Sequence, residues 1–175
     1  MKRTLKTEAV VLRKRSLLNQ DKIITLFTQE IGKISAFAKG IKKITSRRLP
    51  HVQTGNLINT ILYKKNERYY LQETSLISGF SQIKKDQNKV QLLYFFIFIT
   101  DRLLPENQKE EEVYNLFKKY LIELSRSSDF SDALLTKYLN QFLSILGYTK
   151  EDKTFDQLKA IIQEIIHEKI PNLNL

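Results

Sequence analysis

The chain has 175 residues, 42% of them hydrophobic, which is enough apolar material to bury a sizeable core in one or two domains. It has no cysteine, which excludes a disulfide framework, a thiolate zinc site and a cysteine nucleophile. The net charge of +10 lies in the first half of the chain, since residues 1–80 hold 16 of the 29 Lys and Arg but only 5 of the 19 Asp and Glu. This asymmetry is typical of a polyanion-binding half joined to a neutral half.

The first half has the pattern of short strands. Five segments are rich in Val, Ile, Thr, Phe and Tyr and are separated by turn sequences, so we predict strands at 5–12, 22–29, 32–39, 56–63 and 68–77. Ile23, Ile24 and Phe27 also have helical spacing, but the flanking turns favour a strand. Five strands in about eighty residues indicate a small barrel, which we expect to form a nucleic-acid-binding domain over residues 1–80.

The second half has helical periodicity, and we expect a helical domain over residues 81–175. The apolar run 90–99 is about half as long as a membrane helix and predicts a buried central helix. Apolar positions repeat with helical spacing over 113–124, 134–146 and 158–166. We expect Gly147 to end the second of these helices, Thr154 and Gln157 to form a capping box, and Pro171 to stop the last helix. The predicted class is α+β, a barrel followed by a four-helix unit.

No catalytic constellation is apparent in the sequence. His51 and His167 lie in different halves without metal-ligand spacing, so both are interpreted as surface histidines. No phosphate-cradling glycine motif is present, and the adjacent acids are explained by helix starts. We therefore predict no enzymatic activity, no metal and no cofactor. The N-terminal apolar run is too short for a signal peptide or a membrane span, which favours a cytoplasmic protein with no membrane partner.

A binding function is better supported, because residues 32–66 contain no acid. A surface that is merely solvated usually mixes charges of both signs. The candidate phosphate contacts in this stretch are Lys33, Lys39, Lys42, Lys43, Arg47, Arg48, Lys64 and Lys65.

Strand alternation adds an aromatic residue to these cations. In 32–39 it places Ile34, Ala36 and Ala38 on one face, and Lys33, Ser35, Phe37 and Lys39 on the other. Phe37 is therefore either a platform for an unstacked base or part of the barrel core, and the sequence favours neither. Tyr63, Tyr69 and Tyr70 pose the same choice, although one of the adjacent pair must lie near solvent.

Residues 7–49 resemble the N-terminal region of the RecO family of bacterial recombination mediators. The family pattern is an apolar first strand ending in Arg, an Asp-containing turn before a TLFT strand, a Glu-x-Gly-Lys hairpin, and AKG followed by basic residues and a Ser. The matching residues here are Arg13, Asp21, Thr25 to Thr28, Glu30, Gly32, Lys33, Ala38 to Gly40, Lys42, Lys43 and Ser46. DRLLPE at 101–106 and LGY at 146–148 are also similar to the family.

The resemblance implies an OB-fold followed by a helical domain. It implies binding of single- and double-stranded DNA, annealing of complementary strands, and help in recombinase loading, and it adds Arg13 to the candidate DNA-binding residues. The implied partners are RecR and the acidic, apolar C-terminal tail of single-strand-binding protein, in a cytoplasmic, nucleoid-associated setting. Many relatives insert a zinc-binding subdomain after LGY; we expect a compact member lacking that insert.

Two other functions are compatible with the composition. An OB barrel with basic loops could equally be an RNA-binding module of translation or RNA maturation. The basic loop could also meet an acidic protein partner.

Overall fold

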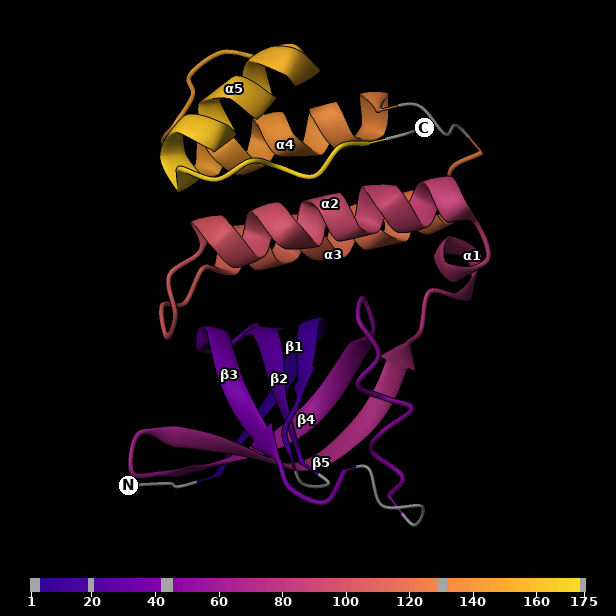
Figure 1. The fold of residues 1–175 in the computed structure, drawn as a ribbon, viewed down its shortest axis with the longest axis vertical. Helices are drawn as coiled ribbons and strands as arrows, with labels where there is room; N and C mark the ends of the chain where they lie inside the picture. Colours follow the sequence, from indigo (N-terminus) through magenta and orange to yellow (C-terminus); the bar gives the residue numbers. More distant parts are fainter. Residues whose placement is uncertain (1–3, 19–20, 42–45, 129–131, 174–175) are drawn as a thin grey trace. The chain divides into compact units, whose positions relative to one another are not determined.

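The computed structural model describes residues 4–18, 21–41, 46–128 and 132–173 (Figure 1). The chain divides into two compact units, one of Met1–Gly79 with Pro105–Glu111 and the other of Phe80–Leu104 with Glu112–Leu175. The short segment Pro105–Glu111 thus belongs with the N-terminal unit, although it lies between two helices in the sequence.

The N-terminal unit is a closed five-stranded barrel with the strand order β1-β2-β3-β5-β4 (Figure 1). Its strands are β1 (Thr4–Ser16), β2 (Lys22–Thr28), β3 (Gly32–Ala38), β4 (Leu57–Lys65) and β5 (Arg68–Ser78). β3 and β5 pair in parallel and the other pairs are antiparallel, which is the OB-fold topology. The predicted barrel is therefore confirmed. β1 runs four residues beyond its predicted end, because a register shift between Val11 and Arg13 lets the basic stretch continue pairing with β2.

The barrel interior is filled by the alternating apolar residues of its strands. Ile34, Ala36 and Ala38 of β3 share one face, as the alternation predicts, and the structure shows that this face is fully buried in the core. Leu62 of β4 and Leu71 of β5 belong to the same cluster. Their strand neighbours consequently project outward, and this fixes the outer surface on which a ligand could bind.

The segment Pro105–Glu111 is attached to the edge of β3. Lys33 forms a parallel bridge with Glu106, and the Asn107 N–H donates to the Lys33 carbonyl at 2.8 Å. Gly32 has φ 74°, and a Cβ there would lie 1.7 Å from the main-chain oxygen of Gln108. Only glycine allows both this conformation and this close approach.

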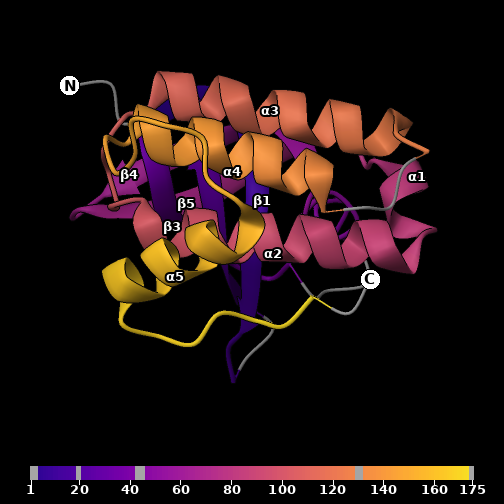
Figure 2. The same ribbon diagram turned by 90° about the horizontal axis from the view of Figure 1, so that it is seen from above.

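The second unit contains the helices. They are α1 (Ser81–Lys84), α2 (Gln87–Leu103), α3 (Glu111–Arg126), α4 (Ala133–Ile145) and α5 (Phe155–Ile166). Figures 1 and 2 show α2, α3 and α4 with their long axes roughly aligned. Phe96 of α2 contacts the rings of Phe117 and Tyr120 from α3 and Phe142 from α4, at centroid distances of 4.4–5.7 Å. The predicted buried central helix is therefore α2. Among the described helices, none has both the length and the apolarity of a membrane span.

The helix ends follow the sequence signals with one exception. Gly147 (φ 80°) ends α4, where Tyr148 N–H donates to the Leu143 carbonyl at 2.9 Å in a Schellman arrangement. Thr154 and Gln157 form the predicted capping box of α5. Pro171 does not stop this helix as predicted, because α5 ends earlier, at Ile166, where the left-handed conformation of the following His167 (φ 53°) breaks the helical path.

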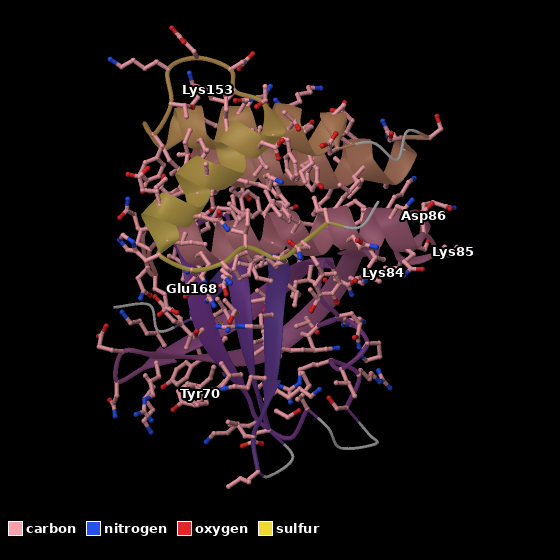
Figure 3. The ribbon with its side chains drawn as sticks, turned by 45° about the horizontal axis from the view of Figure 1, so that its top comes forward. Tyr70, Lys84, Lys85, Asp86, Lys153 and Glu168 are labelled. Atoms are coloured by element: carbon pink, nitrogen blue, oxygen red, sulfur yellow. The ribbon has the colours of Figure 1, made fainter. Side chains whose placement is uncertain are left out.

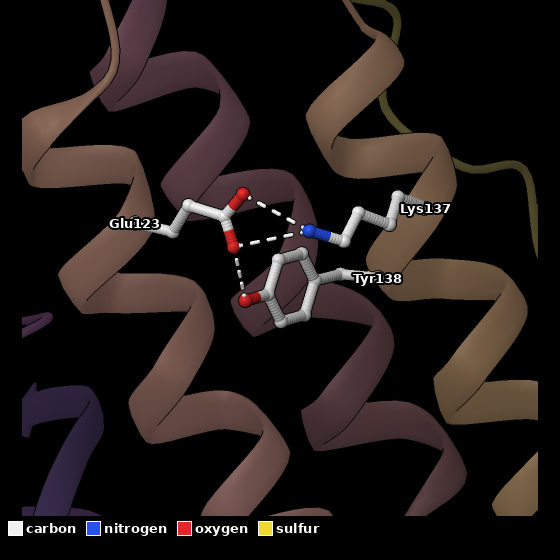
Figure 4. Close-up of polar contacts among 3 residues, drawn as sticks. All are labelled: Glu123, Lys137 and Tyr138. Carbon is white, nitrogen blue, oxygen red and sulfur yellow. Dashed lines mark hydrogen bonds and ion pairs between the residues drawn. The ribbon is translucent and has the colours of Figure 1, made fainter.

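A polar cluster joins α3 and α4 at their surface (Figure 4). The Tyr138 hydroxyl donates to Glu123 Oε2 at 2.6 Å, and Lys137 Nζ donates to both carboxylate oxygens at 3.0 and 3.2 Å. These donors, led by Tyr138, lower the pKa of Glu123. Burial, followed by the contact with Glu123, raises the pKa of Tyr138 above its usual value. The cluster therefore contributes to the packing of two neighbouring helices.

Candidate nucleic-acid interface

A row of apolar and aromatic side chains crosses the outside of the barrel. Strand register pairs Ile23 of β2 with Phe37 of β3, Phe37 with Tyr70 of β5, and Tyr70 with Tyr63 of β4. Directly paired residues share a face of the sheet. Because Ala36 and Ala38, the sequence neighbours of Phe37, point into the core, this row lies on the outer face.

Phe37 and Tyr70 form the centre of this row and are flanked by cations. Their ring centroids are 5.7 Å apart with an interplanar angle of 32°. Lys39 Nζ lies 5.3 Å from the Tyr70 centroid, and the Arg68 guanidinium lies 5.8 Å from the Phe37 centroid. Both rings are half-buried, whereas Lys39 and Arg68 are exposed; Figure 3 labels Tyr70 on the barrel. We call Phe37, Lys39, Arg68 and Tyr70 the aromatic face.

The place of the aromatic face in the barrel matches the surface on which OB-folds bind chains of nucleotides. That surface lies over strands 2 and 3 and the loops joining strands 1 to 2 and 4 to 5. Phe37 is near the end of β3, whose last residue Ala38 pairs with Lys22 directly after the β1–β2 loop. Arg68 and Tyr70 directly follow the turn at Asn66 and Glu67, which joins β4 to β5. Rings flanked by cations can stack on bases while holding phosphates.

The β3–β4 loop presents its two arginines differently. Arg47 is exposed, whereas Arg48 is partly buried. Arg48 Nη1 donates to the Leu71 carbonyl at 2.7 Å, and Nη2 donates to the Lys39 carbonyl at 2.6 Å. Arg48 thus ties the end of the loop to β5 and to Lys39, the residue that follows β3, a structural role that the sequence prediction of a phosphate contact did not include. Lys42 and Lys43, also predicted contacts, lie outside the described residues.

The remaining predicted cations are scattered. Lys33 was expected beside Phe37 on the exposed face, but it is only 8% exposed, and its main chain pairs with Glu106 of the segment Pro105–Glu111. Lys64 Nζ lies 2.7 Å from Glu67, and this hydrogen bond raises its pKa. Lys65 is exposed at the end of β4. Arg13 is exposed on β1 and pairs with Thr25, two residues along β2 from the row of Phe37.

The sequence did not identify Arg68 as a candidate, or Tyr70 as the residue whose ring contacts Phe37. Their contact with Phe37 depends on the parallel pairing of β3 with β5, which joins residues more than thirty positions apart. The available signal was the position of Arg68 directly after a predicted turn, beside two tyrosines.

The two histidines do not form a site. His51 Nδ1 lies 2.9 Å from Thr74 Oγ1 and supports the β3–β4 loop, whereas His167 is exposed at the end of α5. Within residues 4–18, 21–41, 46–128 and 132–173, no group of three or more His, Asp or Glu could hold a metal ion.

Comparison with known proteins agrees with this architecture. A family model described as "Recombination protein O N terminal" matches residues 1–80. Relatives named DNA repair protein RecO are 34% identical in Caldanaerobacter subterraneus subsp. tengcongensis, 32% in Thermoanaerobacter sp. and 31% in Chlorobium limicola. These matches cover 82–83% of this chain and 56–59% of each relative, so the chain spans less than two thirds of their length. The matched barrel, together with similarity that extends into the helices, shows that the chain belongs to the RecO family.

Proposed function

We propose that this chain is a non-enzymatic mediator of DNA repair and recombination, and that it binds single-stranded DNA on the aromatic face. The observation that carries the proposal is the contact pair of Phe37 and Tyr70 on the outside of an OB barrel, each with a cation above its ring. The name of its relatives, DNA repair protein RecO, supports the same role.

The chemistry of the face favours an unpaired strand. Bases in a duplex stack on one another and are not available to protein rings, whereas each unpaired base can stack on an aromatic side chain for about 1–3 kcal/mol. The exposed cations Lys39, Arg47, Lys65 and Arg68 would hold phosphates of either a single strand or a duplex. Single strands would therefore bind more tightly than duplexes, with little sequence preference.

Strand annealing follows from the same surface. Cations that screen phosphate repulsion, and a protein that holds two strands together, both raise the rate of pairing. Within this proposal, annealing and recombinase loading take place with RecR and with the C-terminal tail of single-strand-binding protein as partners. These activities belong to the proposed role as a whole, whereas the aromatic face accounts for contact with the strand.

The test is an annealing assay with two complementary labelled oligonucleotides, with and without single-strand-binding protein. The variant Lys39→Glu, Arg47→Glu, Lys65→Glu, Arg68→Glu reverses the exposed cations but leaves Arg48 in place to hold the loop. A matched control reverses four exposed lysines of the helical unit: Lys85, Lys119, Lys150 and Lys169. Both variants change the net charge equally.

Wild type and control should accelerate annealing, and the barrel variant should not. Equal loss in both variants would show that total charge, rather than this face, is responsible. A parallel competition between DNA and RNA strands of the same sequence tests the substrate class. A clear preference for RNA would contradict the proposed repair role.

A further inference from the structure

A second feature lies beside the aromatic face. The end of β3, the return of the β3–β4 loop and the middle of β5 enclose a surface hollow lined by residues 39–40, 46–48 and 72–74. We call it the loop hollow. Lys39 lines it and also lies over the Tyr70 ring, so the hollow adjoins the aromatic face.

The walls of the loop hollow are held in place. Arg48 joins the Lys39 and Leu71 carbonyls on two sides of it. The Gly40 N–H donates to Asp21 Oδ1 at 2.7 Å, which fixes the turn that leaves β3, where Gly40 has φ 61°. The Thr74 hydroxyl is held by His51 at 2.9 Å. A ligand would therefore meet a site that is largely formed in advance.

The charge of the loop hollow favours an anion. Lys39, Arg47 and Arg48 line it, and Glu73 is the single acid among its lining residues. The carbonyls that accept from Arg48 are neutral, so they do not offset its positive charge. The lining thus keeps an excess of positive charge despite Glu73.

The hydroxyl of Ser46 is the observation that points to a ligand. Its Oγ is buried and has no hydrogen-bond partner within the described part of the chain. A buried polar atom without a partner is unfavourable, and such an atom is often satisfied by an ion or a water molecule. A hydroxyl group can donate to an oxygen of an anion, and the cations of the hollow select for one.

We propose that the loop hollow binds one phosphate group of the strand whose base stacks on the aromatic face, with Ser46 donating to a phosphate oxygen and Arg47 and Lys39 balancing its charge. This deepens the proposed function and rests on it for the identity of the strand. Free phosphate has the same chemistry and would enter the same hollow.

The first experiment titrates the full chain with inorganic phosphate against chloride at constant ionic strength, observed through amide chemical shifts. Saturable shifts at Gly40, Ser46 and Thr74 are expected. Ser46→Ala should weaken phosphate binding about tenfold, because a hydrogen bond to a charged group is lost. Lys119→Gln, which removes an exposed cation of the helical unit, should leave phosphate binding unchanged. The absence of saturable shifts, or an unchanged affinity in Ser46→Ala, would overturn the proposal.

A thermal measurement checks the unpartnered hydroxyl independently. Without phosphate, Ser46→Ala should unfold at a temperature no lower than wild type, because no hydrogen bond is removed. Phosphate should raise the unfolding temperature of wild type more than that of Ser46→Ala. A lower unfolding temperature for Ser46→Ala in chloride would mean that the hydroxyl has a partner, which contradicts the premise.

A competition experiment distinguishes free phosphate from a phosphate of the strand as the ligand of the loop hollow. It also distinguishes failure of the loop hollow from failure of the proposed function. Phosphate should displace a labelled oligothymidine from wild type more strongly than chloride does at the same ionic strength. Phosphate that binds without displacing the strand would overturn the assignment to a strand phosphate. Oligothymidine binding without any phosphate site would refute the hollow alone. Phosphate binding in a protein that binds no strand would refute the proposed function alone.

Discussion

Replacing Phe37 by alanine is the sharpest single test of the aromatic face. The ring lies on the outside of the barrel, half-buried against Tyr70, and is not part of the barrel core. Its removal should therefore weaken strand binding while the barrel stays folded.

The size of both effects follows from the contacts. Loss of one stacked base costs about 1–3 kcal/mol, which is roughly 5- to 150-fold in affinity for a single strand. Loss of the ring pair with Tyr70 and of the half-buried apolar area of Phe37 costs about 1–3 kcal/mol of folding free energy, which a domain of normal stability tolerates. Because the two rings touch, Phe37→Ala combined with Tyr70→Ala should be less damaging than the sum of the single changes.

Fluorescence anisotropy with a labelled oligothymidine measures the affinity, and circular dichroism measures the unfolding transition. Tyr94→Ala is the matched control, since Tyr94 is a 52% exposed aromatic residue of α2. Duplex DNA should bind equally well to wild type and to Phe37→Ala. A folded Phe37→Ala variant that binds the single strand within twofold of wild type would refute the stacking role.

Four further predictions concern other parts of the chain. If four exposed cations each contact a phosphate, the logarithm of the single-strand binding constant should fall with the logarithm of the salt concentration at a slope of about −2.8. This slope corresponds to about fiftyfold weaker binding at ~200 mM than at ~50 mM salt. A slope near zero would contradict these contacts. Arg47→Gln should weaken single-strand binding, measured by titration, with little change in the free energy of unfolding, measured with denaturant. Arg48→Gln should chiefly lower the free energy of unfolding, because its carbonyl partners are left unpaired. Gly32→Ala should lower the free energy of unfolding by at least about 1–3 kcal/mol, and clearly more than Gly147→Ala, since both have positive φ but only Gly32 meets a close main-chain atom. The pKa of Glu123 is lowered in the folded state, so its contribution to stability is present above its unfolded pKa of about 4.3 and is lost as the pH falls through the folded value. In Glu123→Gln, the free energy of unfolding should therefore fall less steeply as the pH is lowered below this range. An unchanged acid dependence would contradict the role of the cluster.

Local signals in the sequence predicted most of the fold. Alternation in β3 placed Ile34, Ala36 and Ala38 on one face, which the structure shows to be the core face, and the capping box at Thr154 marked the start of α5. These features depend on neighbours a few positions away. The end of α5 was missed because a left-handed histidine, rather than the proline after it, breaks the helix.

The candidate site was only partly predictable, because it depends on pairing between distant strands. Phe37 was one candidate, open between a base platform and the core, and its partners Tyr70 and Arg68 come from β5 through a parallel pairing that no local pattern encodes. Lys33 was expected on the same surface, yet the segment Pro105–Glu111 pairs with it from far along the chain. Arg48 looks like any other loop cation in the sequence, and only its carbonyl partners reveal a structural role.

The central claim is that the outside of the barrel around Phe37 and Tyr70 binds single-stranded DNA. Mapping the bound strand on the unmodified protein tests this claim most directly. Amide chemical shifts would be followed while an oligothymidine is added to the full chain. The largest changes should fall at residues 37–39, 47 and 68–72, with small changes in α3, α4 and α5. Changes concentrated in the helical unit, with residues 37–39 and 68–72 unaffected, would contradict it.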